Sequence, residues 1–303
     1  MAGHHHHSSA HLHAHGDGDA AHLHTLEGGR PGVLAWALGL TLLFAVVEVI
    51  AGFLANSLAL ISDAGHMVTD AAALGLALMA QVIARRPPSA KHSFGLVRAE
   101  ALAAFVNALA MLALVAWIGW EAFQRLTHPT PVAGATVTVV AVIGMVINIS
   151  VAWFLSRDKD NVNTRAALIH VMGDLLGSVA ALLAGGIIYF TGWYQADPLL
   201  SVLVCLLILR STFSVLRDAY HFLMEGVPHH IDYVQVGADL AQVPGVLGVH
   251  DLHVWDMSPG QPALIGHLHI AELSDWPGIL GQVKAMLLEK HGIDHITLQP
   301  ELR

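Results

Sequence analysis

Six long apolar segments occupy the first two thirds of the chain and are separated by shorter polar connections. None of them carries more than three ionisable side chains. An α-helix needs about 20 residues to cross the hydrocarbon core of a bilayer, and all six are long enough, the last one only marginally. The pattern therefore predicts six membrane-spanning helices, over Val33–Ala55, Ser62–Ala84, Ala101–Trp120, Val132–Ser156, Thr164–Phe190 and Pro198–Leu216.

The last third of the chain has shorter elements with polar connections. Its periodicity predicts, in order, a helix, two strands, a helix and a strand. This αββαβ order is typical of a small α+β sandwich. The five elements are expected over Ile231–Gln242, Leu247–Trp255, Ala263–Ala271, Trp276–His291 and Ile293–Leu298.

The first 30 residues differ from both parts. Nine histidines fall within positions 1–24, and their spacing does not fit a short expression tag. We interpret this stretch as a disordered, metal-binding, low-complexity tail, because it lacks apolar residues to bury. The predicted domains are therefore 1–30, a His-rich tail; 31–217, a transmembrane domain; and 218–303, a polar C-terminal domain.

Composition supports a membrane protein. Charged residues make up 12% of the 303 residues and hydrophobic residues 55%, whereas soluble domains are about 25% charged. The net charge of −9 argues against nucleic acid as a partner, and the single cysteine, Cys205, excludes a disulfide framework or a Cys-rich zinc module. Residues 218–303 alone carry a net charge of −8.

Basic residues orient the predicted helices. Ten Lys and Arg residues fall on one side of the membrane, and only Arg125 falls on the other. Cytoplasmic loops carry the excess of positive charge. Both termini are therefore expected in the cytoplasm.

Two predicted membrane helices carry the same motif, HxxxD. The second contains His66 and Asp70, and the fifth contains His170 and Asp174. Residues four apart lie on one face of a helix, so two such helices facing each other would offer two imidazoles and two carboxylates. That set suits tetrahedral Zn²⁺, whereas Mg²⁺ and Ca²⁺ prefer oxygen ligands only. The alternative is a purely structural role, in which the two pairs make polar contacts that hold the helices together.

Other ionisable residues in the membrane segments are less informative. Glu48 lies inside the first segment, where it either lines an ion path or pairs with a neighbouring polar group. Asp63, three residues before His66, is either an approach ligand or an interfacial charge.

The motifs resemble those of the cation diffusion facilitator family. The resemblance rests on the stretches Ser57–Asp70, His92–Glu100, Asn163–His170 and Val249–Trp255, and it extends over about residues 32 to 303. Within the family, the chain is most similar to bacterial cobalt–zinc–cadmium resistance and zinc exporters. The family's transport ligands correspond to His66, Asp70, His170 and Asp174, and a histidine at the first of these positions implies a preference for zinc.

The resemblance implies a homodimer of six-helix protomers with a ferredoxin-like, metallochaperone-like cytoplasmic domain. It also implies zinc efflux, with cadmium or cobalt as further substrates, in exchange for protons. A ligating histidine must be neutral and a ligating aspartate ionised, so protons compete with metal at the same atoms. Zinc would be the substrate and a regulatory ligand, with no cofactor, and the simple organisation suits a bacterial inner membrane.

The C-terminal domain offers a second metal site. By position, His250, His267 and Glu301 correspond to ligands of the family's cytoplasmic site. Some relatives have a histidine where this chain has Asp294, and His295 is its neighbour; only one of these two can face the site, because side chains alternate along a strand. We interpret His253 and Trp255 as core or interface residues, whereas His269 and His291, which also lie in this domain, receive no role.

Two other functional classes have less support. A membrane metalloenzyme would need an open coordination position beside a general base, and the chain contains no HExxH motif. A metal sensor would use the His-rich tail and the C-terminal domain as its receptor. The chain also has no GxxxxGK[ST] phosphate-binding loop, which argues against an ATP-driven pump. We therefore predict a secondary transporter that is not an enzyme.

Overall fold

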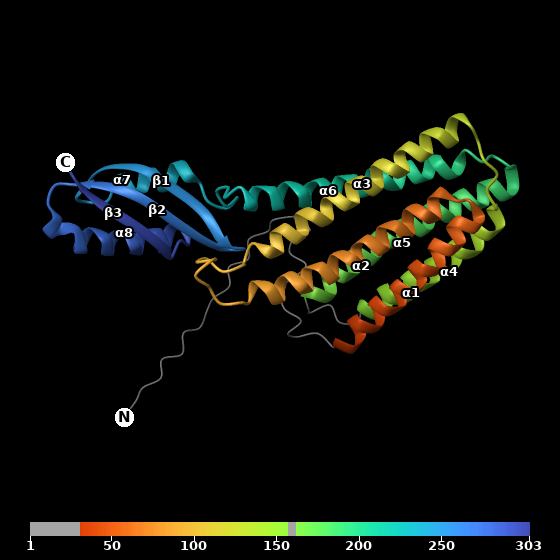
Figure 1. Cartoon of the computed structure of the whole chain (residues 1–303), viewed down its shortest axis with the longest axis horizontal. Helices are drawn as coiled ribbons and strands as arrows, with labels where there is room; N and C mark the ends of the chain where they lie inside the picture. The colour runs from red at the N-terminus through yellow and green to blue at the C-terminus, as the bar shows by residue number, and fades with distance from the viewer. Residues whose placement is uncertain (1–30, 157–161) are drawn as a thin grey trace, which may run out of the picture.

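The computed structural model describes residues 31–156 and 162–303, with side chains described at all of these except 31–38, 162–167, 169 and 170. The predicted His-rich tail, residues 1–30, lies outside the described residues. The described chain forms a helical domain followed by a small α+β domain at one end (Figure 1).

Six helices form the first domain, and they confirm the six predicted spans. They are α1 (Pro31–Ala55), α2 (Leu58–Ala84), α3 (Ala99–Thr127), α4 (Gly134–Leu155), α5 (Val162–Thr191) and α6 (Ala196–Leu223). In the described residues, five are long and apolar enough to cross a membrane, and Gly39–Ala55 of α1 is a shorter apolar helix. Large side chains such as Leu54 and Phe190 are more than three quarters exposed, as expected of surfaces that face lipid.

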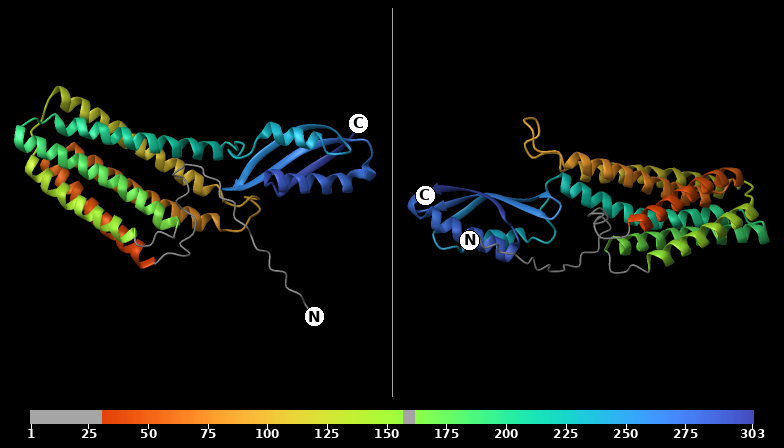
Figure 2. Two further views of the ribbon diagram at one scale, coloured as in Figure 1. Left: turned by 180° about the vertical axis from the view of Figure 1, so that it is seen from behind. Right: turned by 90° about the horizontal axis from the view of Figure 1, so that it is seen from below.

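The helix α2 lies at the centre of the bundle. It contacts α1, α3, α5 and α6, while α4 packs on α5 and α3 packs on α6 (Figures 1 and 2). Small residues such as Ala141 and Ala184 fill the contact between α1, α2, α4 and α5 and allow the helices to approach closely. Asn148 of α4 donates a hydrogen bond to Ser178 of α5 at 3.1 Å.

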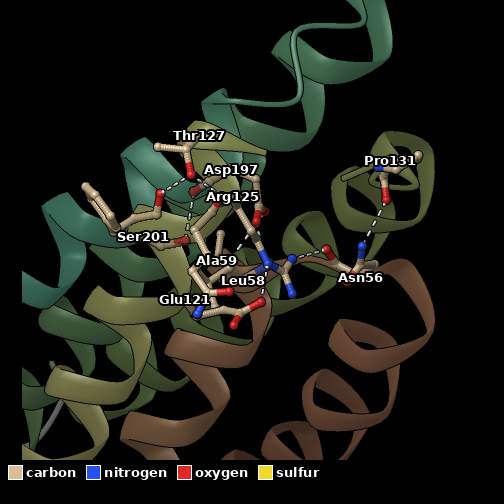
Figure 3. A network of polar contacts seen from close by, with 11 residues as sticks. Asn56, Leu58, Ala59, Glu121, Arg125, Thr127, Pro131, Asp197 and Ser201 are labelled. Carbon is tan, nitrogen blue, oxygen red and sulfur yellow. Dashed lines mark hydrogen bonds and ion pairs between the residues drawn. The ribbon is translucent and has the colours of Figure 1, made fainter. Parts of the chain in front are cut away.

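A buried carboxylate fixes the beginning of α2. Asp197 of α6 accepts hydrogen bonds from the Ser57 hydroxyl and the Leu58 amide, both at 2.5 Å, and from the Ala59 amide at 3.3 Å (Figure 3). A carboxylate at a helix N-terminus satisfies free amides and opposes the helix dipole. Nearby, Arg125 of α3 donates to the carbonyl of Asn56 at 2.6 Å. These contacts hold α2, α3 and α6 together at one end of the bundle.

Two helices extend beyond their apolar segments. The apolar segments were expected to end at Trp120 and Leu216, but α3 continues to Thr127 and α6 continues to Leu223. Polar residues outside the bilayer are compatible with a continuing helix, so hydropathy gives the span but not the end of the helix. The predicted domain boundary at residue 217 consequently falls inside α6.

The C-terminal domain has the predicted αββαβ order. It contains α7 (Tyr233–Ala241), β1 (Val246–Ser258), β2 (Gln261–Ile270), a short 3₁₀ turn (Leu273–Asp275), α8 (Trp276–His291) and β3 (His295–Leu302). The sheet order is β1-β2-β3; β1 and β2 are antiparallel, and β2 and β3 are parallel. Both helices pack on the same core as one face of the sheet, where Leu264, Leu268 and Ile270 are fully buried. The alternate residues His267 and His269 therefore lie on the opposite face of β2.

Candidate metal centres

The structure places the two HxxxD motifs on neighbouring helices. His66 and Asp70 lie on α2, His170 and Asp174 lie on α5, and these helices are in contact. On α2, His66 Nε2 lies 3.4 Å from Asp70 Oδ2, with the two side chains 21% and 26% exposed. Asp174 is only 1% exposed. The His170 side chain lies outside the described residues, so the four-residue site remains a prediction.

Further carboxylates surround this region. Asp63 is 3% exposed inside the bundle and lies so close to α5 that a Cβ at Gly177 would overlap its carboxylate. Asp63 is therefore a buried group rather than an interfacial charge. Glu48 of α1 is completely buried, and among the described residues neither of its carboxylate oxygens has a hydrogen-bond partner.

These buried carboxylates interact with one another. Glu48 experiences the charges of Asp63 and Asp174, and Asp63 experiences that of Asp174. Like charges in a low-dielectric interior repel strongly, and a bound cation would offset that repulsion. A cation between α1, α2 and α5 would therefore be stabilised by whichever of these carboxylates is ionised.

The candidate ligands in the C-terminal domain converge more closely. His250, His267 and Glu301 are, within the described residues, the group of three whose ligand atoms all lie within 4.8 Å of one another. Glu301 Oε2 lies 2.9 Å from His250 Nε2, and Glu301 Oε1 lies 2.8 Å from His267 Nδ1. Three neighbouring strands supply one residue each, and the β1–β2 register sets His250 opposite His267. The cluster lies on the face of the sheet that α7 and α8 leave open.

Glu301 is suited to ligation. The hydrogen bond from His267 has the largest effect and lowers the pKa of Glu301. Burial opposes it, and the hydrogen bond and charge of His250 lower the pKa further. The carboxylate is therefore ionised at neutral pH, as a metal ligand must be.

One residue of this cluster was missed in the sequence. His269 Nε2 lies 3.3 Å from Glu301 Oε2, and its ring centroid lies 4.6 Å from that of His250. The signal was present, because His267 and His269 are two apart on a strand and so share one face. Which face of the sheet His267 and His269 occupy was not predictable without knowing how the sheet packs against the helices.

The structure does not bring Asp294 and His295 to this cluster. They precede and begin β3, where His295 pairs with Ala263, whereas Glu301 pairs with His269 near the other end of the strand. At about 3.3 Å per residue, the two ends lie about 20 Å apart. Asp294 and His295 instead line a separate hollow with Met257 and Gln261.

Comparison with known proteins identifies relatives that match most of the chain. Residues 34–224 match the family described as the cation efflux transmembrane domain, and residues 228–303 match the cytoplasmic domain of cation efflux proteins. The chain is 43% identical over 281 residues to the zinc transporter ZitB of Escherichia coli, covering 92% of this chain and 90% of that protein.

Two further relatives are similarly extensive. The cadmium, cobalt and zinc/H⁺–K⁺ antiporter of Bacillus subtilis is 39% identical over 281 residues, covering 91% of this chain and 90% of that protein. The metal cation efflux system protein CzcD of Cupriavidus metallidurans is 40% identical over 285 residues, covering 93% and 90%. Among solved structures, the metal-bound C-terminal domain of CzcD is 33% identical, with a TM-score of 0.23, and covers 24% of this chain and 100% of that domain.

Proposed function

Since the chain belongs to the cation diffusion facilitator family of metal cation efflux proteins, we propose that it exports zinc from the cytoplasm in exchange for protons. It is an integral membrane protein with a helical membrane domain and a small α+β domain. The names of its relatives support the choice of ion, since one is a zinc transporter and another an antiporter for cadmium, cobalt and zinc. Cadmium and cobalt are the proposed secondary substrates.

The observation that carries this proposal is the pair of HxxxD motifs on the adjacent helices α2 and α5. His66 and His170 would each give one imidazole nitrogen, and Asp70 and Asp174 one carboxylate oxygen each. The two aspartates would neutralise the charge of Zn²⁺, so the loaded site would have little net charge in the low-dielectric interior. The buried carboxylates of Glu48 and Asp63 would help to draw the cation into the bundle.

Proton coupling follows from competition at the ligands. Zinc binds only when both histidines are neutral and both aspartates are ionised. Where protons are abundant outside the cell, protonation would displace zinc from an outward-facing site. The membrane potential would also assist the return of positive charge to the cytoplasm.

The cytoplasmic cluster is proposed as a regulatory zinc site. His250, His267 and Glu301 would ligate the ion, and His269 lies within reach of the same carboxylate. The C-terminal domain carries a net charge of −8, so two such domains in a homodimer would repel each other until cations bind. We place both termini in the cytoplasm and the protein in a bacterial inner membrane. The proposed domains are 1–30, 31–217 and 218–303, and the last residues of α6 continue into the third of them.

Flux through purified protein tests the proposal. The protein would be reconstituted into sealed vesicles with a zinc-sensitive dye inside, with and without an imposed proton gradient. We expect zinc uptake that accelerates when the lumen is more acidic than the outside. If zinc uptake were no faster than in protein-free vesicles, both with and without the proton gradient, the assignment as a zinc transporter would be refuted.

A further inference from the structure

A second group of histidine and aspartate side chains lies where α6 meets the C-terminal domain. Asp218 and His221 lie in the last turns of α6, His229 lies in the segment that follows, and Asp256 lies near the end of β1. They line a cavity of about 190 Å³ between the end of α6 and the β1–β2 turn. Figure 1 shows β1 directed from the C-terminal domain toward the membrane helices. None of these residues belongs to the two centres described above.

The chain folds back sharply to build this junction. The Gly226 amide donates to the His221 carbonyl at 2.9 Å, and a Cβ at Gly226 would overlap the His221 ring. The turn brings His229 over His221, with ring centroids 4.5 Å apart and planes 16° from parallel. Two imidazoles that are eight residues apart in the chain are therefore stacked at the end of the membrane domain.

The hydrogen bond of His221 fixes the tautomer that a metal-binding histidine needs. His221 Nε2 lies 2.7 Å from the carbonyl oxygen of Val227, and a carbonyl can only accept a hydrogen bond. The proton therefore resides on Nε2, and the lone pair of Nδ1 is available. Histidines that bind metal commonly donate their second ring N–H to a backbone carbonyl in this way.

Two carboxylates accompany the imidazoles. Asp218 Oδ1 lies 3.9 Å from His229 Nε2, slightly more than the roughly 3.4 Å that separates two ligands on one tetrahedral zinc ion. Asp256 Oδ1 is buried and has no hydrogen-bond partner within the part of the chain that the structure describes. A buried acceptor without a donor is costly, and a cation would satisfy it.

We propose that the junction between α6 and the C-terminal domain is a separate divalent-cation site, with Asp218, His221, His229 and Asp256 as its ligands. Two nitrogens and two oxygens without a thiolate suit zinc-like ions. The side chains of His229 and Asp218 are 62% and 35% exposed, so an ion can enter directly from the aqueous side. The four ligands come from α6, the following segment and β1, and a bound ion therefore ties the cytoplasmic domain to the last membrane helix. In the structure no three ligand atoms of these residues all lie within 4.8 Å of one another, and the His221 and His229 rings are stacked. Binding would therefore require the exposed His229 ring to turn and the ion to draw β1 and α6 together.

Zinc counting in the full-length protein tests the site. The purified detergent-solubilised chain would be dialysed against buffered Zn²⁺, and the bound metal measured by elemental analysis for wild type and the double variant His221→Ala, His229→Ala. The matched control is His92→Ala with His128→Ala, two exposed loop histidines. The His-rich tail contributes equally to all three proteins, so differences report the junction.

We expect the junction variant to bind one zinc fewer per chain at saturation and the control to match wild type. Equal zinc contents in all three proteins, or an equal loss in the control, would overturn the proposal.

A second variant distinguishes loss of the site from misfolding of the double variant. Asp256→Asn keeps the size of the side chain and removes the buried charge. We expect its melting temperature without metal to equal or exceed that of wild type. When zinc is added, we expect its melting temperature to rise less than that of wild type, because the contribution of the junction site is lost. A zinc-induced rise as large as in wild type would show that Asp256 does not ligate zinc and that the site is wrong. Neither measurement uses transport, so the result stands whether or not the chain carries zinc.

Discussion

At the scale of single residues, the nature of the ligand atoms would decide which ion the proposed transport site carries. His66 offers a borderline-soft nitrogen. It lies on the same face of α2 as Asp70, with His66 Nε2 3.4 Å from Asp70 Oδ2. Borderline ions such as zinc favour imidazole, whereas harder ions favour oxygen. The choice of nitrogen or oxygen at position 66 should therefore set selectivity without removing the site.

His66→Asp tests this selectivity. The variant keeps a ligand but makes the set harder, so we expect zinc flux to fall and the ratio of cadmium or manganese flux to zinc flux to rise on the order of tenfold. Competing-ion uptake into vesicles measures the ratio. The control is His92→Asp in the exposed α2–α3 connection, which should leave the ratio unchanged. An unchanged ratio in His66→Asp would exclude His66 as a ligand.

Glu301 should make stability depend on pH. Its pKa is lowered in the folded protein, chiefly by the hydrogen bond from His267, so its contribution is present above the ordinary value of 4.5 and is lost as pH falls through the lower folded value. We expect Glu301→Gln to lower the melting temperature at pH 7 in chelator and to flatten the further fall below about pH 4.5. Melting of the full-length protein checks this, with the exposed Glu289→Gln as the control. Parallel pH profiles for wild type and Glu301→Gln would contradict the role of this carboxylate.

At the scale of helices and strands, the bundle brings α2 and α5 together by close packing. Asp197 caps the beginning of α2. Farther along α2, the Asp63 carboxylate lies against Gly177 of α5, where a side chain would leave no room for it. Hydropathy predicted the six helices, because a span must be about 20 apolar residues long, and spacing predicted the shared face of each HxxxD pair. Neither signal predicts how two helices are rotated toward each other.

The same limit applies to the C-terminal domain. The strand pattern placed His267 and His269 on one face but did not show that Glu301, rather than Asp294 or His295, would meet them. Convergence depends on the parallel pairing of β2 with β3, which sets His269 opposite Glu301. The junction cluster was missed for a related reason, since its members come from α6, the segment after it and β1, and no local spacing links them.

Gly177→Ala tests the contact between α2 and α5. The added methyl group would overlap the Asp63 carboxylate and push the two helices apart, so we expect zinc flux to fall at least several-fold at equal protein level. The matched control is Gly186→Ala on the same helix, where a Cβ has no neighbour within 4 Å. Equal flux in the two variants would show that the distance between these helices does not matter for transport.

At the scale of the whole molecule, charge determines orientation. Among the described residues, the α2–α3 connection carries four basic residues and lies on the side of the C-terminal domain, where Arg98 pairs with Glu225. Arg125 lies at the opposite end of the bundle with the Asp197 network. Cytoplasmic loops carry the positive excess, so the α3–α4 connection should face away from the cytoplasm. The acidic C-terminal domain and the junction site would then lie in the compartment from which metal is removed.

Thr130→Cys tests the orientation. Thr130 is exposed in the α3–α4 connection, so this cysteine should react with a membrane-impermeant thiol reagent in intact spheroplasts. Ser89→Cys, exposed in the α2–α3 connection, should react only after lysis, and the native Cys205 is buried. The reverse pattern of labelling would invert the topology.

Zinc uptake by the two aspartate variants tests the central claim most directly. Wild type, Asp70→Ala and Asp174→Ala would be compared in vesicles at matched protein content, with Asp275→Ala, which removes an exposed carboxylate of the C-terminal domain, as the control. Each membrane variant removes a charge that offsets the cation in the low-dielectric interior, which is worth several kcal/mol, so we expect flux to fall more than about 100-fold while the control matches wild type. Wild-type rates in both membrane variants would mean that the HxxxD pairs only staple α2 and α5 and that zinc crosses elsewhere.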